Sequence, residues 1–365
     1  MGYAEIVATG YDVPEGIIDN KYIAETNPHA IFGIGKDKDG NPGLLYRVCN
    51  RVDERGNPFF SDELIALSYE KIIKNTGGIE FRRRVSDGNE GEGPYESHVD
   101  LVERAFKKTG FSASKLDGII VATISQPEGM NFPGIAWQVQ KRLGIRRTDI
   151  FTEDIGAACS GFTHALDHAM LRVEKYGGYY LVVGVDTLTR LTDYSEINCD
   201  LFGDGCGLAV VGPTEDIHRR ILATSFKSIV NEAKQGNSVQ AIHYIVKDNK
   251  GKIRMPYGPQ VARDGRKAMI DNSHDLIQMI GANKDDVAKW FPQQANGNML
   301  KKMEEEMGVE GRIYWTLQRY GNMSAANVPL ALAEAIERNV VKRGDLVILV
   351  DVGSGLAVGG SAIIL

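Results

Sequence analysis

Cysteine is scarce in this sequence, and the spacing of the few cysteines excludes two kinds of site. No two of them form a Cys-X-X-Cys pair, the usual unit of a structural zinc site or a redox dithiol. Free thiols in a long chain fit a reducing compartment. We therefore expect no metal site, a cytoplasmic location and unpaired thiols at the four positions Cys49, Cys159, Cys199 and Cys206.

Long apolar runs and an excess of positive charge are also lacking. Residues 1–86 contain neither a charged segment followed by an apolar core nor a run long enough to span a bilayer, so we expect no export and no membrane insertion. The net charge is −6 and no basic stretch is interleaved with aromatic residues, which argues against nucleic-acid binding. A hydrophobic share of 43% and a charged share of 25% are those of an ordinary globular protein.

The sequence does contain short β-branched runs that alternate with longer amphipathic segments. Several runs are apolar throughout, which is typical of strands that helices cover on both faces, so the pattern predicts an α/β fold. Strands are expected at residues 4–9, 117–124, 150–155, 179–185, 207–211, 346–352 and 360–365. Helices are expected at residues 62–76, 98–109, 133–143, 161–176, 264–280, 294–307 and 324–339.

A chain of 365 residues exceeds one ordinary core, and its composition shifts near residues 212–215. We predict two halves with a similar strand–helix rhythm, residues 1–214 and residues 215–365. Residues 27–60 are rich in turn-forming residues, so we expect an irregular insertion or cap there. The polar stretch at residues 231–251 is expected to be a loop.

One cysteine, Cys159, lies where an apolar run gives way to an expected helix, in the sequence Asp154-Ile155-Gly156-Ala157-Ala158-Cys159-Ser160-Gly161-Phe162. A helix N-terminus lowers the pKa of a thiol through its unpaired N–H groups and its dipole. This setting predicts a nucleophilic thiolate, with small neighbours that leave room for an acyl chain. The alternative is that Cys159 only packs in the core, as most free cysteines do.

Four sequence blocks in the same order resemble the β-ketoacyl-acyl-carrier-protein synthase III family of thiolase-fold condensing enzymes. The blocks are residues 157–162, 201–207, 291–296 and 320–326, and the terminal Gly353-Ser354-Gly355-Leu356 matches as well. The resemblance covers residues 77–214 and 286–365. It implies a thiolase-like layered α-β-α-β-α fold of two similar halves, a homodimer, and thioesters of coenzyme A or acyl carrier protein as substrates, with no bound cofactor.

The resemblance also implies roles for single residues. Cys159 is the nucleophile that accepts the acyl group, and Asn322 donates a hydrogen bond to the substrate carbonyl that becomes enolate-like. The backbone N–H groups of Cys159 and Ser354 match the oxyanion hole, where fixed donors stabilise a developing negative charge. From the residues alone, Asn322 can equally be a turn residue that caps the following helix.

The chain departs from the family at Gln293, which stands where the family has a catalytic histidine. Glutamine donates a hydrogen bond but does not accept a proton near neutral pH, so we expect weakened or redirected decarboxylation, with a glutamine N–H recovering part of the loss. Gln293 is either natural or an introduced replacement. No other histidine is expected to substitute: His164 and His168 are interpreted as packing side chains, and the solvated ones are His29, His98, His218, His243 and His274.

The family's clamp for coenzyme A is incomplete. Asn75 stands near an expected arginine, residues 69–84 lack the tryptophan, and the arginine expected near residues 196–198 is missing. Basic residues that remain as candidates for phosphates or an acidic carrier, or else as plain solvated surface, are Arg82, Arg83, Arg84, Lys301 and Lys302.

The leading hypothesis is an acyltransferase of fatty acid or polyketide biosynthesis. It forms an acyl-Cys159 thioester and transfers the acyl group in a Claisen-type condensation with a malonyl-type or β-keto thioester. One alternative is transfer to an oxygen, nitrogen or sulfur nucleophile without decarboxylation. The other is a scaffold subunit paired with an active homologue, which the retained Cys159 disfavours.

Overall fold

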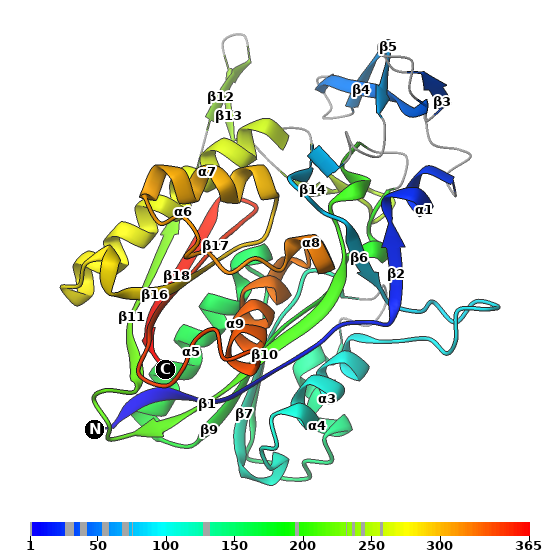
Figure 1. The fold of residues 1–365 in the computed structure, drawn as a ribbon. Helices are drawn as coiled ribbons and strands as arrows, with labels where there is room; N and C mark the ends of the chain where they lie inside the picture. Colours follow the sequence, from blue (N-terminus) through cyan, green and yellow to red (C-terminus); the bar gives the residue numbers. More distant parts are fainter. Residues whose placement is uncertain are drawn as a thin grey trace.

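A computed structural model of the chain describes residues 2–25, 33–36, 42–52, 58–67, 73–74, 76–126, 132–193, 197–230, 232–235, 238–241, 245–255 and 258–365. Two sheets with helices on their faces make up the body of the molecule (Figure 1).

The first sheet has five strands in the order β1-β10-β9-β7-β8. β1 runs antiparallel to β10 and β10 antiparallel to β9, whereas β9, β7 and β8 are parallel. Inward-facing and outward-facing side chains alike are buried in β7, β9 and β10, as expected for strands covered on both faces. The bounds are β1 Tyr3–Asp12, β7 Leu116–Ala122, β8 Phe151–Ile155, β9 Tyr179–Thr187 and β10 Asp204–Thr214.

The second sheet repeats this arrangement with four strands in the order β11-β18-β17-β16. Its first two pairings are antiparallel and its third is parallel. A parallel bridge between Trp290 and Ile313 lies on the far edge of β16, where the first sheet has β8. The bounds are β11 Arg220–Ser228, β16 Val287–Pro292, β17 Leu346–Gly353 and β18 Ala357–Ile364. The division of the chain at residue 214 remains a prediction.

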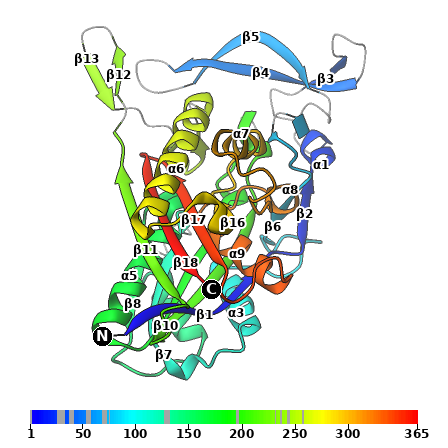
Figure 2. The ribbon, with the colours of Figure 1, turned by 60° about the vertical axis from the view of Figure 1, so that its left-hand side comes forward.

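Helices form three layers around the two sheets (Figure 2). α3 (His98–Lys108) and α4 (Ile135–Arg142) cover the outer face of the first sheet, and α6 (Gly258–Ile280) and α7 (Gly297–Met307) that of the second. α5 (Gly161–Tyr176) and α9 (Asn327–Glu337) lie between the sheets. The expected five-layer α-β-α-β-α fold is confirmed.

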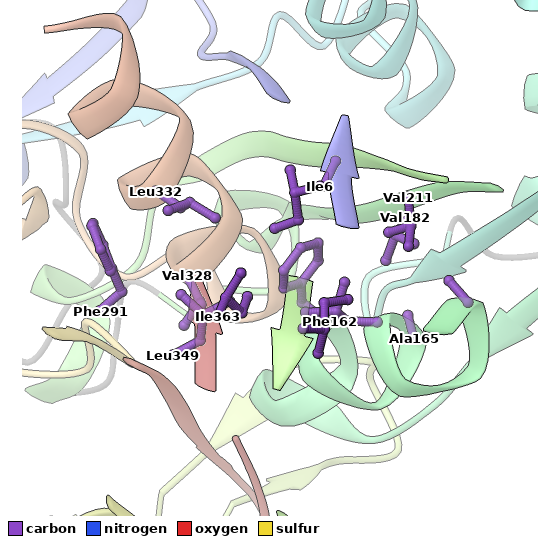
Figure 3. Close-up of a cluster of buried hydrophobic side chains, with 14 of the residues drawn as sticks. Ile6, Phe162, Ala165, Val182, Val211, Phe291, Val328, Leu332, Leu349 and Ile363 are labelled. Atoms are coloured by element: carbon purple, nitrogen blue, oxygen red, sulfur yellow. The ribbon is translucent and has the colours of Figure 1, made fainter. Parts of the chain in front are cut away.

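The main core is this central layer (Figure 3). Phe162 of α5 and Val328 of α9 pack against Val182 of the first sheet and Leu349 of the second. α9 also lies close against β10, because a Cβ atom on Gly207 would come within 2.2 Å of the backbone nitrogen of Leu330. Gly205 and Gly207 therefore lie in the first part of strand β10, beside a helix.

Smaller elements surround the layers. β2 pairs with β6, β12 with β13 and β14 with β15, and β3, β4 and β5 form a sheet at the periphery of the body (Figure 1). Their bounds are α1 Asn20–Glu25, β2 Gly16–Asp19, β3 Gly33–Lys36, β4 Pro42–Val52, β5 Pro58–Leu67, β6 Phe81–Arg84, β12 Glu232–Gln235, β13 Ser238–Ala241, β14 Val246–Lys247, β15 Ile253–Arg254 and α8 Leu317–Tyr320.

Several local predictions were wrong. The expected helix at residues 62–76 is strand β5 as far as Leu67, where Leu64 pairs with Arg47 of β4, whereas residues 73, 74 and 76 are helical as expected. Residues 68–72 and 75 of that helix lie outside the described residues. The insertion at residues 27–60 contains β3, β4 and the start of β5 instead of irregular structure, and residues 231–251 contain β12, β13 and β14. β11 and β16 were not predicted.

Candidate active site

Cys159 lies on a sharp turn between β8 and α5. The 3₁₀ turn Ala158–Ser160 leads directly into α5, and Ala158 has a φ of 50°, in the left-handed region that costs a residue with a Cβ atom about 1–3 kcal/mol. Gly161 sits so close to β7 that a Cβ atom there would lie 2.7 Å from the Cβ of Ala122. The local sequence of small residues therefore allows a strained turn that presents the thiol.

A second turn of the same kind faces the first. The 3₁₀ turn Ser324–Ala326 leads into α9, Ser324 also has a φ of 50°, and the two turns are in contact. Asn322 precedes this turn, and its backbone is held by Leu201 and Gly203: its N–H donates to the carbonyl of Leu201 at 2.8 Å, and its own carbonyl accepts from the N–H of Gly203 at 2.9 Å.

A cavity of about 600 Å³ brings the predicted site residues together. Cys159, Gln293, Asn322 and Ser354 all line it. Gln293 follows β16 and Ser354 follows β17, so the cavity lies at the carboxyl ends of these parallel strands, against the turn that carries Cys159.

The side-chain amides in the cavity have fixed orientations. The Ser324 N–H donates to one atom of the Asn322 amide at 3.0 Å, so that atom is the oxygen Oδ1. Asn322 Oδ1 also accepts from Gln293 Nε2 at 3.1 Å and from Asn327 Nδ2 at 2.9 Å. Gln293 is fully buried, and its Oε1 has no hydrogen-bond partner among the described residues. Asn322 Nδ2 is thus the amide donor left for the cavity, whereas Gln293 Oε1 is a buried acceptor with no accessible surface.

This geometry corrects the expectation that a Gln293 N–H helps to polarise the substrate carbonyl. Gln293 Nε2 is occupied by Asn322 Oδ1, which needs donors because it carries no hydrogen of its own. Of the two predicted donors, the side chain of Asn322 is the one that can reach a substrate oxygen.

The expected lowering of the Cys159 pKa is also wrong for the free protein. Burial raises the pKa of the Cys159 thiol to about 12, and the buried carboxyl groups of Asp186 and Asp351 add to this effect. The Ser324 hydroxyl and the backbone N–H of Cys159 act in the opposite direction but are outweighed. Cys159 is therefore a protonated thiol at neutral pH.

Ser354 is held beside Cys159 by close backbone packing. A Cβ atom on Gly353 would lie 2.5 Å from the carbonyl oxygen of Ala157, so the end of β17 rests on the Cys159 turn. The Ser354 hydroxyl donates to the carbonyl of Ile245 at 2.8 Å. The backbone N–H groups of Cys159 and Ser354 as an oxyanion hole remain a prediction that fits this packing.

Asp186 supports the second turn and was missed in the sequence. Its Oδ1 accepts hydrogen bonds from both the N–H and the hydroxyl of Ser125, at 3.0 Å and 2.7 Å, and its Oδ2 accepts from the Ala325 N–H at 3.2 Å. The hydroxyl of Thr123 and the N–H of Ile124 also donate to Oδ1, each at 2.9 Å. Because these partners lie far apart in the chain, no local pattern indicates them.

Three basic side chains line the same cavity: Arg263 and Arg266 of α6 and Lys302 of α7. Arg263 pairs with Asp264 and Arg266 with Glu306. Lys302 was among the predicted candidates, whereas the two arginines were missed, although their spacing of three places them on one face of a helix.

Other candidates are placed elsewhere. Arg82 is fully buried and donates to the carbonyl of Asp200 and to Asn20, and Arg84 pairs with Asp87 and Glu92, so neither lies on a free phosphate-binding surface.

His98 is buried rather than solvated, with Nε2 2.8 Å from the Ser125 hydroxyl. Burial, and then Arg190, lower the pKa of His98 to about 4. His168 is exposed, with Nδ1 3.0 Å from Glu153 Oε2, so its interpretation as a packing side chain is wrong. The calls at His29, Asn75, Glu196 and His243 fall outside the described residues.

The two sheets have matching topology, and the Ala158–Ser160 turn that carries Cys159 contacts the Ser324–Ala326 turn that follows Asn322. This arrangement defines a thiolase-fold enzyme. Sequence models of 3-oxoacyl-[acyl-carrier-protein (ACP)] synthase III match residues 153–229, and residues 277–365 for its C-terminal part. The chain is 34% identical over 315 residues to "Beta-ketoacyl-[acyl-carrier-protein] synthase III" of Natranaerobius thermophilus, covering 83% of this chain and 92% of that protein. The chain belongs to the 3-oxoacyl-[acyl-carrier-protein] synthase III family.

Solved structures agree with this assignment. The crystal structure of 3-oxoacyl-[acyl-carrier-protein] synthase III from Aquifex aeolicus is 27% identical with a TM-score of 0.76, covering 99% of this chain and 100% of that chain. The synthase III from Thermus thermophilus is 25% identical with a TM-score of 0.75, covering 99% of each chain.

Among the helices described here, none is both long and apolar enough to cross a bilayer.

Proposed function

We propose that this protein is a condensing acyltransferase that carries its acyl group on Cys159 and passes it to the carbon of a second thioester. The observation that carries the proposal is the shared cavity, in which the Cys159 turn meets the donor Asn322 Nδ2. The names of the relatives, which are β-ketoacyl-[acyl-carrier-protein] synthases, support a condensing reaction of this class.

In the first step, Sγ of Cys159 attacks the acyl carbon of a carrier thioester. The backbone N–H groups of Cys159 and Ser354 hold the oxyanion of the tetrahedral intermediate. Because the thiol is protonated in the free protein, its proton leaves during this step and ends on the departing carrier sulfur. The exchange of one thioester for another needs no metal and no bound cofactor.

In the second step, Asn322 Nδ2 stabilises the enolate-like oxygen of the second thioester. A neutral amide donor suits this role, since it cannot give up its proton to the oxygen that it holds. With Gln293 in place of histidine, one donor rather than two faces that oxygen, so decarboxylation of a malonyl thioester is slow.

The basic side chains at the cavity support a phosphate-bearing carrier. Arg263, Arg266 and Lys302 would attract the phosphate of coenzyme A or of the phosphopantetheine arm of an acyl carrier protein. We place the enzyme in the cytoplasm as a homodimer.

An acylation assay tests the proposed function. The protein is incubated with an acyl-pantetheine thioester, and its intact mass is recorded. We expect one acyl adduct on the wild type and on the control C199A, in which a buried cysteine away from the cavity is removed, and none on C159A. An unmodified wild type, or an adduct that persists in C159A, would overturn the role of Cys159 and favour the scaffold alternative.

A further inference from the structure

Ser324 is a serine in an unfavourable setting. Its φ of 50° lies in the left-handed region, where glycine is unstrained and a residue with a Cβ atom is not. Its side chain is 1% exposed, and its hydroxyl has no hydrogen-bond partner among the described residues. Glycine would avoid both the strain and the unpartnered hydroxyl, and alanine would avoid the second. A side chain that destabilises the folded protein in two ways points to a use during the reaction.

The Ser324 hydroxyl lies beside the nucleophile. The turns that carry Cys159 and Ser324 contact each other, and a Cβ atom on Gly161 would lie 3.9 Å from the Cβ of Ala325. Burial raises the pKa of the Cys159 thiol to about 12, and the Ser324 hydroxyl is near enough to act in the opposite direction. A hydroxyl donor favours a thiolate over a thiol, because a charged acceptor makes the stronger hydrogen bond.

The other groups around the sulfur leave a need for this donor. Buried carboxyl groups of Asp186 on β9 and Asp351 on β17 oppose the ionisation of Cys159. The backbone N–H of Cys159 favours ionisation, but in the proposed reaction it holds the oxyanion of the acyl group instead. While the acyl group is in place, the Ser324 hydroxyl is the donor that remains for Sγ.

We propose that Ser324 is a further catalytic residue, whose hydroxyl donates a hydrogen bond to Sγ of Cys159 whenever that sulfur carries negative charge. This inference rests on the proposed function, because the sulfur gains and loses an acyl group in that reaction. No ligand has to reach the hydroxyl, since its partner is an atom of the protein. In the free protein the sulfur is a protonated thiol and a weak acceptor, so the donor is not used.

The hydroxyl acts in both steps of the reaction. In the first, Sγ bonds to the acyl carbon, the bond from that carbon to the carrier sulfur breaks, and the thiol proton ends on the carrier sulfur. In the second, a malonyl thioester loses carbon dioxide and its carbanion attacks the acyl carbon. The carbon–sulfur bond to Cys159 then breaks, and Sγ leaves with the electron pair and takes a proton from water. The Ser324 hydroxyl keeps its own hydrogen throughout.

The hydroxyl can be removed without disturbing the backbone of Ser324. The Ser324 N–H, which donates to Asn322 Oδ1 at 3.0 Å, is kept in S324A and in S324G. S324A removes the hydroxyl alone, and S324G also removes the strain at φ 50°. We expect the Tm of both variants to stay close to that of the wild type, because the lost hydroxyl has no partner in the free protein.

Alkylation by iodoacetamide tests the proposal without any substrate. Its rate at about pH 8 measures the thiolate fraction of Cys159, followed by peptide mass. We expect alkylation to be about tenfold slower in S324A and S324G than in the wild type, because a hydrogen bond to a charged group is lost. The matched control is S273A on α6, since Ser273 is also fully buried with an unpartnered hydroxyl but does not line the cavity. An unchanged rate in both Ser324 variants would overturn the proposal, as would an equal fall in S273A.

Acylation by an acyl-pantetheine thioester tests the role in the reaction. The formation of acyl-Cys159 is followed by intact mass in a single turnover over a range of thioester concentrations. We expect the saturating rate constant to fall about tenfold in S324A, with the half-saturating concentration unchanged, because the hydroxyl contacts Sγ and not the substrate. A loss confined to the half-saturating concentration would contradict this role.

Failure of this inference differs from failure of the proposed function. If the wild type and S324A form acyl-Cys159 at the same rate, the acyl transfer stands and the role of Ser324 is wrong. If the wild type forms no acyl-Cys159, the proposed function fails, and the alkylation rates still decide whether Ser324 stabilises the thiolate.

Discussion

At the scale of single residues, the structure shows that the Cys159 thiol can occupy the nucleophile's position without being ionised. Cys159 occupies the start of a helix, the position that activates thiols in many enzymes, yet burial outweighs that effect and raises its pKa to about 12. A thiol with this pKa reacts slowly at neutral pH, because only a small fraction of it is thiolate. Accidental alkylation or oxidation of the free enzyme is then disfavoured.

The alkylation of Cys159 by iodoacetamide should follow this raised pKa. Only the thiolate reacts, so far below the pKa the rate rises tenfold for each pH unit. We expect a continuous rise from about pH 7 to about pH 10, with no plateau, measured by peptide mass at Cys159. A plateau near neutral pH would instead reveal a thiolate activated by the helix N-terminus and would contradict the dominance of burial.

The identities of the site residues could be predicted from the sequence, but their hydrogen-bond roles could not. Cys159, Gln293 and Asn322 stand in recognisable blocks, and the structure gathers them at one cavity. The direction of the Gln293 amide depends on Asn327 and on the N–H of Ser324, groups whose positions arise only when the turn before α9 folds. That the Gln293 N–H is used by Asn322 Oδ1, and not by the substrate, therefore cannot be read from the residue type alone.

At the scale of elements, Asp186 at the end of β9 holds the Ser324–Ala326 turn in place. A buried carboxylate that accepts hydrogen bonds from two neighbouring segments fixes their separation, here Ser125 after β7 and Ala325 before α9. Since Asn322 directly precedes this turn and its Oδ1 accepts from the Ser324 N–H, Asp186 is a positioning residue for the donor in the cavity. It does not line that cavity itself.

The substitution D186N should weaken both the turn and the reaction. Asparagine keeps the size of the side chain but turns one acceptor into a donor, which opposes an N–H or O–H already present and costs about 1–3 kcal/mol of unfolding free energy. We expect a lower Tm and a lower kcat for condensation, while acylation of Cys159 falls less. The control is D167N on α5, where the asparagine Oδ1 can still accept from the Thr224 hydroxyl, which donates to Asp167 Oδ1 at 2.7 Å. Equal effects on both steps would indicate a purely structural role.

The elements that sequence analysis located best are those with strong local periodicity. α5 begins and ends where predicted, at Gly161 and Tyr176. β5 was mistaken for a helix because the sequence of residues 58–67 contains helix-forming residues, and only its pairing with β4 makes it a strand. Pairing between distant strands, which decides such cases, is not encoded in the local pattern.

At the scale of the whole molecule, a buried carboxyl group in each sheet accepts a hydrogen bond from one of the two central turn–helix segments. Asp186 of the first sheet accepts from Ala325, which precedes α9, while Asp351 of the second sheet accepts from the Thr163 hydroxyl of α5 at 2.7 Å. Burial raises the pKa of both carboxyl groups. The repeated sheet order and these contacts explain why the thiol and the amide donor, which lie at two separate turns, meet at one cavity.

The charge of the whole chain gives a last prediction, which concerns the carrier. The net charge is −6, so an acidic carrier protein is repelled in general and needs a local basic surface. Lys302 lines the cavity together with Arg263 and Arg266, whereas the neighbouring Lys301 is exposed but does not line it.

We expect K302E to raise KM for an acyl carrier protein thioester by about tenfold, with kcat little changed, because the charge attracts the carrier rather than the reacting carbon. The same variant should raise KM for an acyl-coenzyme A thioester similarly if the lysine contacts the shared phosphate arm, and less if it contacts the protein surface of the carrier. Steady-state kinetics at two salt concentrations measure both, with K301E as the matched control, since charge attraction weakens as salt rises. An equal rise of KM in K301E would mean that the overall surface charge attracts the carrier, and not the basic side chains that line the cavity.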